Sequence, residues 1–213
     1  GEGGVVELRE DFLKAAEELC RADGALLICD EIQCGLGRTG RFFAFQKYDL
    51  KPDVVVVAKP LAAGLPLSAI LAREEVAQAF SSGMHGTTFG GGPLQCRLAL
   101  KVLEILERPG FLERVREVGA YFRAQLEKLQ GELPLIREIR GQGLMLAAEL
   151  AVPGKSVVRE ALEAGFLMNC TQEKVLRFLP PLIVEQGHVD ELIAALQPIL
   201  EALSHGEEKG VTA

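Results

Sequence analysis

The sequence lacks several features that would assign it to common classes of protein. Its 213 residues carry 23 Lys and Arg against 30 Asp and Glu, which gives a net charge of −7. Nucleic-acid-binding proteins usually have a basic face, so this balance argues against that class. No apolar run approaches the length of a membrane-spanning helix, and the first residues do not form a signal peptide. With 48% apolar and 25% charged residues, the composition is that of an ordinary soluble globular protein.

Paired cysteines and clustered metal ligands are also missing. The cysteines number five, and no two of them have a CxxC spacing. They are Cys20, Cys29, Cys34, Cys96 and Cys170, and the equally scattered histidines are His85, His188 and His205. A zinc site needs ligands at short spacings, so no metal site is expected. The odd number predicts reduced, mostly buried thiols and a cytoplasmic protein.

Apolar periodicity predicts strands and helices in alternation over the first half of the chain. Short continuous apolar runs, typical of strands buried on both faces, are expected at residues 25–29, 54–58 and 68–72. Helical spacing is expected at residues 9–22 and 73–80, and a long helix opens at Pro93. This is an α/β pattern.

The character of the sequence changes after a second long helix, expected at residues 111–129. The remaining elements are shorter, with strands at residues 144–150 and 175–179 and helices at residues 156–164 and 189–203. We expect residues 1–115 to be the carboxyl-terminal part of a cofactor-binding large domain, and residues 116–204 to be a small carboxyl-terminal α+β domain. Residues 205–213 are expected to be a polar, disordered tail.

Three features carry candidate chemistry. Asp30 and Lys59 each follow a buried strand, and ligands of open α/β sheets bind outside the carboxyl ends of strands. The loop HGTTFGGGP at residues 85–93 places two hydroxyls and small residues before a helix, a pattern that can hold a phosphate. A lysine, a carboxylate and a phosphate site together suggest pyridoxal 5′-phosphate (PLP). The amine would form a Schiff base with the aldehyde, and the carboxylate would keep the pyridine nitrogen protonated.

These features belong to a longer pattern, DEIQCGLGRTGRFFAFQKYDLKPDVVVVAK at residues 30–59, which is followed by HGTTFGGGPL. The pattern resembles the signature of the class III (subgroup II) aminotransferases, in which the lysine lies 29 residues after the aspartate. The resemblance covers nearly the whole chain. It implies the fold type I of PLP-dependent transferases, and a homodimer with shared active sites.

The resemblance also implies roles for particular residues. Asp30, with its neighbours Glu31 and Ile32, would contact the cofactor, and Gln33 would lie near its phenolic oxygen. Lys59 would hold the aldehyde and later move a proton between substrate and cofactor.

The remaining roles concern phosphate and substrate. Thr88 would bind the phosphate of the neighbouring subunit's cofactor, and Thr87 would face the substrate. Arg177, in VLRFLPPL, would receive the substrate α-carboxylate through two parallel N–H donors. Glu2, in GEGGV, would pair with Arg177 when a substrate end without a carboxylate enters. A structural alternative for Arg177 is an arginine at a sheet edge.

The carboxyl-terminal segment is most similar to the family members that act on N-acetylornithine. This implies transfer of its terminal amine to 2-oxoglutarate, in arginine biosynthesis. The alternatives are other class III ω-aminotransferases that act on ornithine, succinyldiaminopimelate or 4-aminobutyrate, an aminomutase, or a non-catalytic piece that only dimerises or binds a partner. A dinucleotide-binding oxidoreductase fits poorly, because no GxGxxG loop is present.

Departures from the family pattern lie beside the expected cofactor. Gly92 stands where the family usually has Asn, and residues 60–64 read PLAAG where the family tends to have a glycine-rich run. Proline lacks an N–H, and alanine permits fewer backbone angles than glycine. The chain begins GEGGVVE without an initiator Met, and the family's aromatic residue and Gly-Thr/Ser phosphate loop are absent. We therefore expect a fragment that is not a competent enzyme alone.

Overall fold

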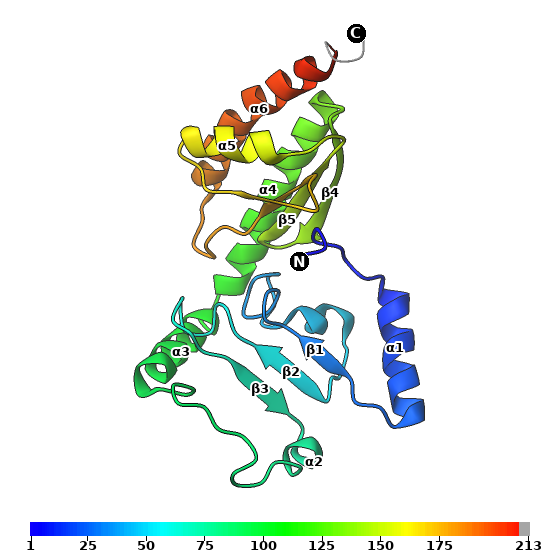
Figure 1. The fold of residues 1–213 in the computed structure, drawn as a ribbon, viewed down its shortest axis with the longest axis vertical. Coiled ribbons are helices and arrows are strands. Elements are labelled where there is room, and N and C mark those ends of the chain that lie inside the picture. The colour runs from blue at the N-terminus through cyan, green and yellow to red at the C-terminus, as the bar shows by residue number, and fades with distance from the viewer. Residues whose placement is uncertain (209–213) are drawn as a thin grey trace. The chain divides into compact units, whose positions relative to one another are not determined.

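The structure, a computed structural model, describes residues 1–208, of which residues 205–208 are described by their backbone only. The chain forms two compact units (Figure 1). The first is Leu8–Glu113, and the second joins Gly1–Glu7 to the chain from Arg114 onward. The division falls close to the expected boundary at residue 115. The first seven residues, however, pack with the second unit instead of the first.

A three-stranded sheet forms the centre of the first unit. Its strands are β1 (Ile28–Asp30), β2 (Val54–Val57) and β3 (Ala69–Ala72), in the order β1-β2-β3. β1 is parallel to β2, and β3 is antiparallel to it. The valines of β2 are mostly buried, as expected for a central strand.

The expectation that residues 25–29 form a strand buried on both faces is wrong. Only Ile28–Asp30 is a strand, and Ile28 is 58% exposed. β1 is an edge strand, which has a hydrogen-bonded neighbour on one side only among the described residues. The apolar run therefore predicted the presence of a strand, but it did not predict how much of that strand is exposed.

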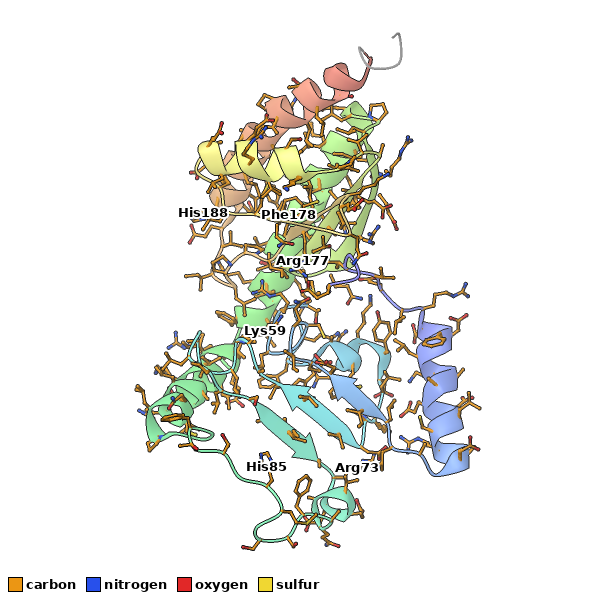
Figure 2. All side chains as sticks on the ribbon, viewed as in Figure 1. Lys59, Arg73, His85, Arg177, Phe178 and His188 are labelled. Carbon is orange, nitrogen blue, oxygen red and sulfur yellow. The ribbon has the colours of Figure 1, made fainter. Side chains whose placement is uncertain are left out.

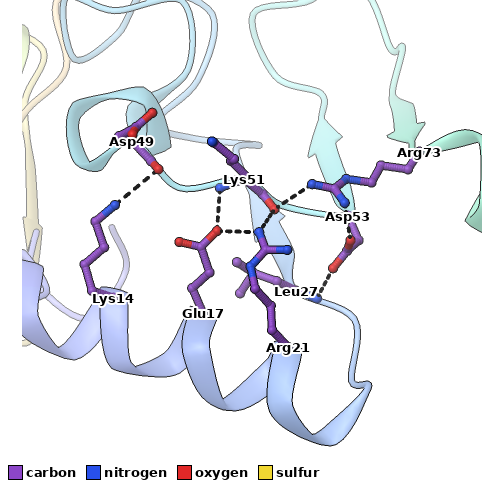
Figure 3. A network of polar contacts seen from close by, with 8 residues as sticks. All are labelled: Lys14, Glu17, Arg21, Leu27, Asp49, Lys51, Asp53 and Arg73. Carbon is purple, nitrogen blue, oxygen red and sulfur yellow. Dashed lines mark hydrogen bonds and ion pairs between the residues drawn. The ribbon is translucent and has the colours of Figure 1, made fainter.

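Polar contacts tie helix α1 (Glu10–Asp23) to the loop that precedes β2 (Figure 3). The Glu17 carboxylate accepts the Lys51 N–H at 2.9 Å and an Arg21 N–H at 2.8 Å. Arg21 also donates to the Lys51 carbonyl at 3.4 Å. The network lies at the amino end of β2, so it leaves the carboxyl end of the sheet to other residues.

Three other helical segments lie in the first unit, and a fourth begins there and continues into the second unit. They are η1 (Ala44–Tyr48), α2 (Glu74–Ala77), α3 (Pro93–Leu106) and α4 (Phe111–Glu132), which continues into the second unit. α2 is shorter than the helix expected at residues 73–80. After it, the N–H groups of Ala79 and Phe80 bond three residues back, as in a 3₁₀ turn, so the α-helix ends early.

The second unit contains a four-stranded antiparallel sheet in the order β4-β5-β7-β6. Its strands are β4 (Ile136–Gln142), β5 (Met145–Leu150), β6 (Asn169–Thr171) and β7 (Val175–Phe178). Its helices, besides α4, are α5 (Lys155–Glu163) and α6 (Gln186–Glu208). α6 extends to Glu208, so the first four residues of the expected tail are helical. The other five tail residues lie outside the described part.

The two faces of this sheet differ. Leu146, Leu176 and Phe178 are buried, and the Phe178 ring meets Phe122 of α4 with centroids 5.2 Å apart. The opposite face carries Arg140 and Arg177, each in register with Ala147. The helix side is therefore the core. None of the helices within residues 1–208 is long and apolar enough to cross a membrane.

Candidate active site

Asp30 and Lys59 lie at the same edge of the first sheet. Asp30 is the last residue of β1 and is in register with Val56, and Lys59 follows β2 by two residues. Since the two strands are parallel, both carboxyl ends meet at this edge, where the side chains of Asp30 and Lys59 are exposed. Figure 2 labels Lys59 at this edge. Asp30 Oδ1 accepts the Ile32 N–H at 3.0 Å, which orients its carboxylate. A carboxylate and an amine thus follow two neighbouring strands at the same edge of the sheet.

Glu31 has a structural position that the sequence did not reveal. It is only 2% exposed, and its two carboxylate oxygens accept the N–H groups of Ala44 and Phe45, each at 2.9 Å. A Cβ at Gly35 would lie 2.8 Å from that of Glu31, so only glycine fits there. Glu31 therefore holds η1, and its expected contact with a cofactor stays a prediction.

The residues that follow Glu31 form the turn after β1. Ile32 and Gln33 are half-buried beside Asp30. The Cys34 thiol lies 3.5 Å from a Glu31 carboxylate oxygen. Burial, and then the negative charge of Glu31, raise the pKa of Cys34 to about 12. Cys34 is therefore a protonated thiol at neutral pH, without the thiolate character of a nucleophile.

The turn after Lys59 has a strained alanine. The Leu61 N–H donates to the Ala58 carbonyl at 2.6 Å, and the Ala63 N–H donates to the Pro60 carbonyl at 3.2 Å. Ala63 has φ +52°, in the left-handed region that favours glycine. The departure noted at residues 60–64 therefore has a structural consequence directly after the candidate lysine.

The threonine pair lies in the loop that joins α2 to α3. Thr87, Thr88 and His85 are all exposed there, and the loop ends at Gly92, the residue before the first turn of α3 (Figure 2). Gly92 adopts φ −57°, which any residue can adopt, so the backbone itself does not require glycine at this position. The hydroxyls are accessible to a phosphate, and the role of Thr88 stays a prediction.

Arg177 and Glu2 form an ion pair within the second unit. Arg177 Nη1 lies 2.7 Å from Glu2 Oε1, and the arginine side chain is 10% exposed while that of Glu2 is 74% exposed. Arg177 is in the middle of the sheet, in register with Ala147 on one side and Asn169 on the other. The alternative of a sheet-edge arginine is therefore wrong. Its Nε is buried without a hydrogen-bond partner among the described residues.

A cavity of about 700 Å³ adjoins this arginine. Most of its apolar wall comes from the segments 166–168 and 179–184, and β7 and the start of α6 supply the polar residues Arg177, His188 and Glu191. A nearly buried guanidinium with a displaceable carboxylate partner can bind the carboxylate of a ligand. The pairing of Glu2 with Arg177 agrees with the sequence-based expectation.

Sequence reasoning missed one polar residue of this face. Arg140 donates to the Gly4 carbonyl at 2.8 Å and pairs with Glu138 and Glu149 at 2.7 and 2.5 Å. Arg137, Glu138 and Arg140 interrupt the apolar residues of β4, so the sequence carried no regular strand pattern that could have indicated this face.

The fold agrees with the comparisons to known proteins. The model of the aminotransferase class-III family matches residues 1–200, and the chain belongs to this family. The acetylornithine aminotransferase of Aquifex aeolicus is 52% identical over 201 residues, which are 94% of this chain and 51% of the relative. That of Methanocaldococcus jannaschii is 50% identical over 199 residues, 93% of this chain and 50% of the relative. The chain thus spans about half the length of these relatives.

Solved structures show the same fold. The ornithine aminotransferase from Toxoplasma gondii matches with a TM-score of 0.90 at 38% identity, over 97% of this chain and 50% of that one. The acetylornithine aminotransferase from Elizabethkingia anophelis matches with a TM-score of 0.87 at 32% identity, over 95% and 52%. These neighbours confirm the expected PLP-transferase fold of mixed α/β architecture.

Proposed function

We propose that this chain supplies the lysine-bearing part of a PLP-dependent aminotransferase that moves the terminal amine of N-acetylornithine to 2-oxoglutarate, in arginine biosynthesis. The observation that carries the proposal is the placement of Asp30 and Lys59 at one carboxyl edge of a parallel strand pair. The amino donor is inferred from relatives named acetylornithine aminotransferase at 50–52% identity.

The residues present fit the cofactor. When bound, PLP supplies an electron sink for the bond that must break at the amine-bearing carbon. Asp30 would pair with the protonated pyridine nitrogen. Lys59 would hold the aldehyde and then carry the proton at that carbon. Thr88 would hold a phosphate across a homodimer interface, and Gln33 would lie beside the phenolic oxygen.

The second unit would select the substrate by charge. Arg177 would bind an α-carboxylate through its guanidinium, and Glu2 would occupy Arg177 when no carboxylate is there. Thr87 would face the substrate. The five unpaired cysteines support a cytoplasmic location, which stays a prediction, as does the homodimer.

A second amino donor, ornithine, is favoured by the Toxoplasma gondii neighbour at 38% identity. The two donors differ by a charge at one end, because acetylation neutralises the α-amine. Initial rates with each donor and 2-oxoglutarate separate the two readings. A requirement for 2-oxoglutarate also distinguishes an aminotransferase from an aminomutase.

Covalent mapping tests the cofactor assignment directly. The chain is incubated with PLP, reduced with borohydride and digested, and the modified peptide is identified by mass spectrometry. We expect the label on Lys59, and its loss in Lys59→Ala. Lys51→Ala, at the other end of β2, is the matched control and should keep the label. A label spread evenly over exposed lysines, unchanged in Lys59→Ala, would refute the assignment.

A further inference from the structure

The amino-terminal segment Gly1–Glu7 lies on the polar face of the sheet in the second unit. It is placed there by contacts with three strands or turns of that sheet. Arg140 of β4 donates from Nε to the Gly4 carbonyl at 2.8 Å, and Gln172 donates from Nε2 to the Glu2 carbonyl at 3.0 Å. Val5, the residue after Gly4, is buried, so the segment has an apolar anchor beside these polar ones.

Arg140 is itself held tightly. Its side chain is 14% exposed, and its Nη1 contacts Glu138 on its own strand and Glu149 on β5. The arginine therefore has little freedom to leave the Gly4 carbonyl. Gly4 is shaped to this contact, because it has φ +99° and a Cβ there would lie 3.1 Å from Arg140 Nη2.

These contacts determine where the Glu2 carboxylate can be. Arg140 and Arg177 are both in register with Ala147, so the anchor and the ion pair occupy one row across the sheet. A tether two residues from Glu2 keeps its carboxylate at a high effective concentration near Arg177. Any carboxylate ligand of Arg177 must displace it.

We propose that Arg140 is a positioning residue that sets how strongly Glu2 competes with carboxylate ligands for Arg177. The inference rests on the proposed role of Arg177 as a carboxylate site. Arg140 makes no contact with the ligand itself. It acts through the segment that carries Glu2, and so it adjusts the discrimination between substrates with and without a carboxylate at this point.

The test is a titration with glutarate, a dicarboxylate that cannot react, at constant ionic strength. Binding is followed by isothermal titration calorimetry, so that the affinity can be measured in Arg177→Met as well. We expect Glu2→Gln to tighten binding about three- to fivefold, the range for a partly exposed ion pair. Arg140→Met should tighten it in the same direction, and the double variant should bind no more tightly than Glu2→Gln alone.

Controls separate positioning from damage. Arg137→Met, on an exposed arginine of the same strand, should leave the affinity unchanged. Gln172→Ala removes the second anchor without touching a buried residue, so it tests the idea if Arg140→Met does not fold, and it should also tighten binding. Partial unfolding would weaken binding, which is the opposite result.

Each remaining outcome has a definite meaning. If glutarate binding depends on Arg177 but neither Arg140→Met nor Gln172→Ala changes it, the positioning role is wrong and the carboxylate site stands. If glutarate fails to bind even in Glu2→Gln, or binds equally well in Arg177→Met, the carboxylate site is wrong, and the inference fails with it.

Discussion

Two adjacent alanines after Lys59 should respond in opposite directions to the same substitution. Ala63 has φ +52°, whereas Ala62 is not among the residues with positive φ and is fully buried. Ala63→Gly relieves a left-handed backbone that costs about 1–2 kcal/mol for a residue with a Cβ. The greater backbone freedom of glycine also stabilises the unfolded state by about 0.4–1 kcal/mol, which offsets part of this gain. The net expectation is a stabilisation of about 0.5–1 kcal/mol.

Ala62→Gly has the opposite balance. It removes a buried methyl group worth about 0.8 kcal/mol and adds a glycine penalty of about 0.5–1 kcal/mol. We expect a destabilisation of about 1.5 kcal/mol. Both variants remove one methyl group and change no charge, so each is the control for the other.

Tyrosine fluorescence can follow the unit that contains these alanines. The chain has no Trp and two Tyr, of which Tyr48 lies in the first unit and Tyr121 in the second. In a Tyr121→Phe background, urea unfolding therefore reports on the first unit, and the midpoint should move by a few tenths of a molar for Ala63→Gly. A lower midpoint for Ala63→Gly would show that its backbone angle is not the source of strain.

Three further outcomes follow from the described contacts. Glu31→Ala leaves two N–H groups of η1 without acceptors and should destabilise the first unit by about 2–4 kcal/mol, measured by the same urea transition, with Glu31→Gln losing less. Cys34 should react with a thiol reagent at pH 8 far more slowly than the exposed Cys96, because its folded pKa is raised to about 12. The Cys34 thiol ionises at lower pH in the unfolded chain than in the folded one, so its contribution to folding stability should be lost as the pH rises from 9 to 12. The urea midpoint should therefore fall over this range, and it should fall less in Cys34→Ala. Arg114→Met removes donors to the three carbonyls of residues 182–184 and should speed hydrogen exchange at the start of α6.

Local sequence patterns predicted the elements that depend on local interactions. The valine run before Lys59 became β2, and the strand that ends at Asp30 became β1, so the shared edge of Asp30 and Lys59 followed from two parallel strands. The exposure of Ile28 could not be foreseen, because burial depends on what covers a strand and not on the strand itself. β4 was missed, since Arg137, Glu138 and Arg140 interrupt its apolar residues, so that neither a continuous apolar run nor a regular alternation marks the strand.

Arg140 and Arg177 show why the site itself was only partly predictable. Arg177 could be singled out by the motif around it, because its neighbours in the chain carry the signal. The contact of Arg140 joins residues 136 positions apart, through a carbonyl oxygen that every residue possesses. A backbone acceptor leaves no trace in the sequence, so the partner of Arg140 could be known only once the strands were in register. The same holds for Glu31, whose carboxylate binds two backbone N–H groups of η1, more than ten residues further along the chain. Residues proposed to contact substrate were therefore easier to find than those proposed to position them.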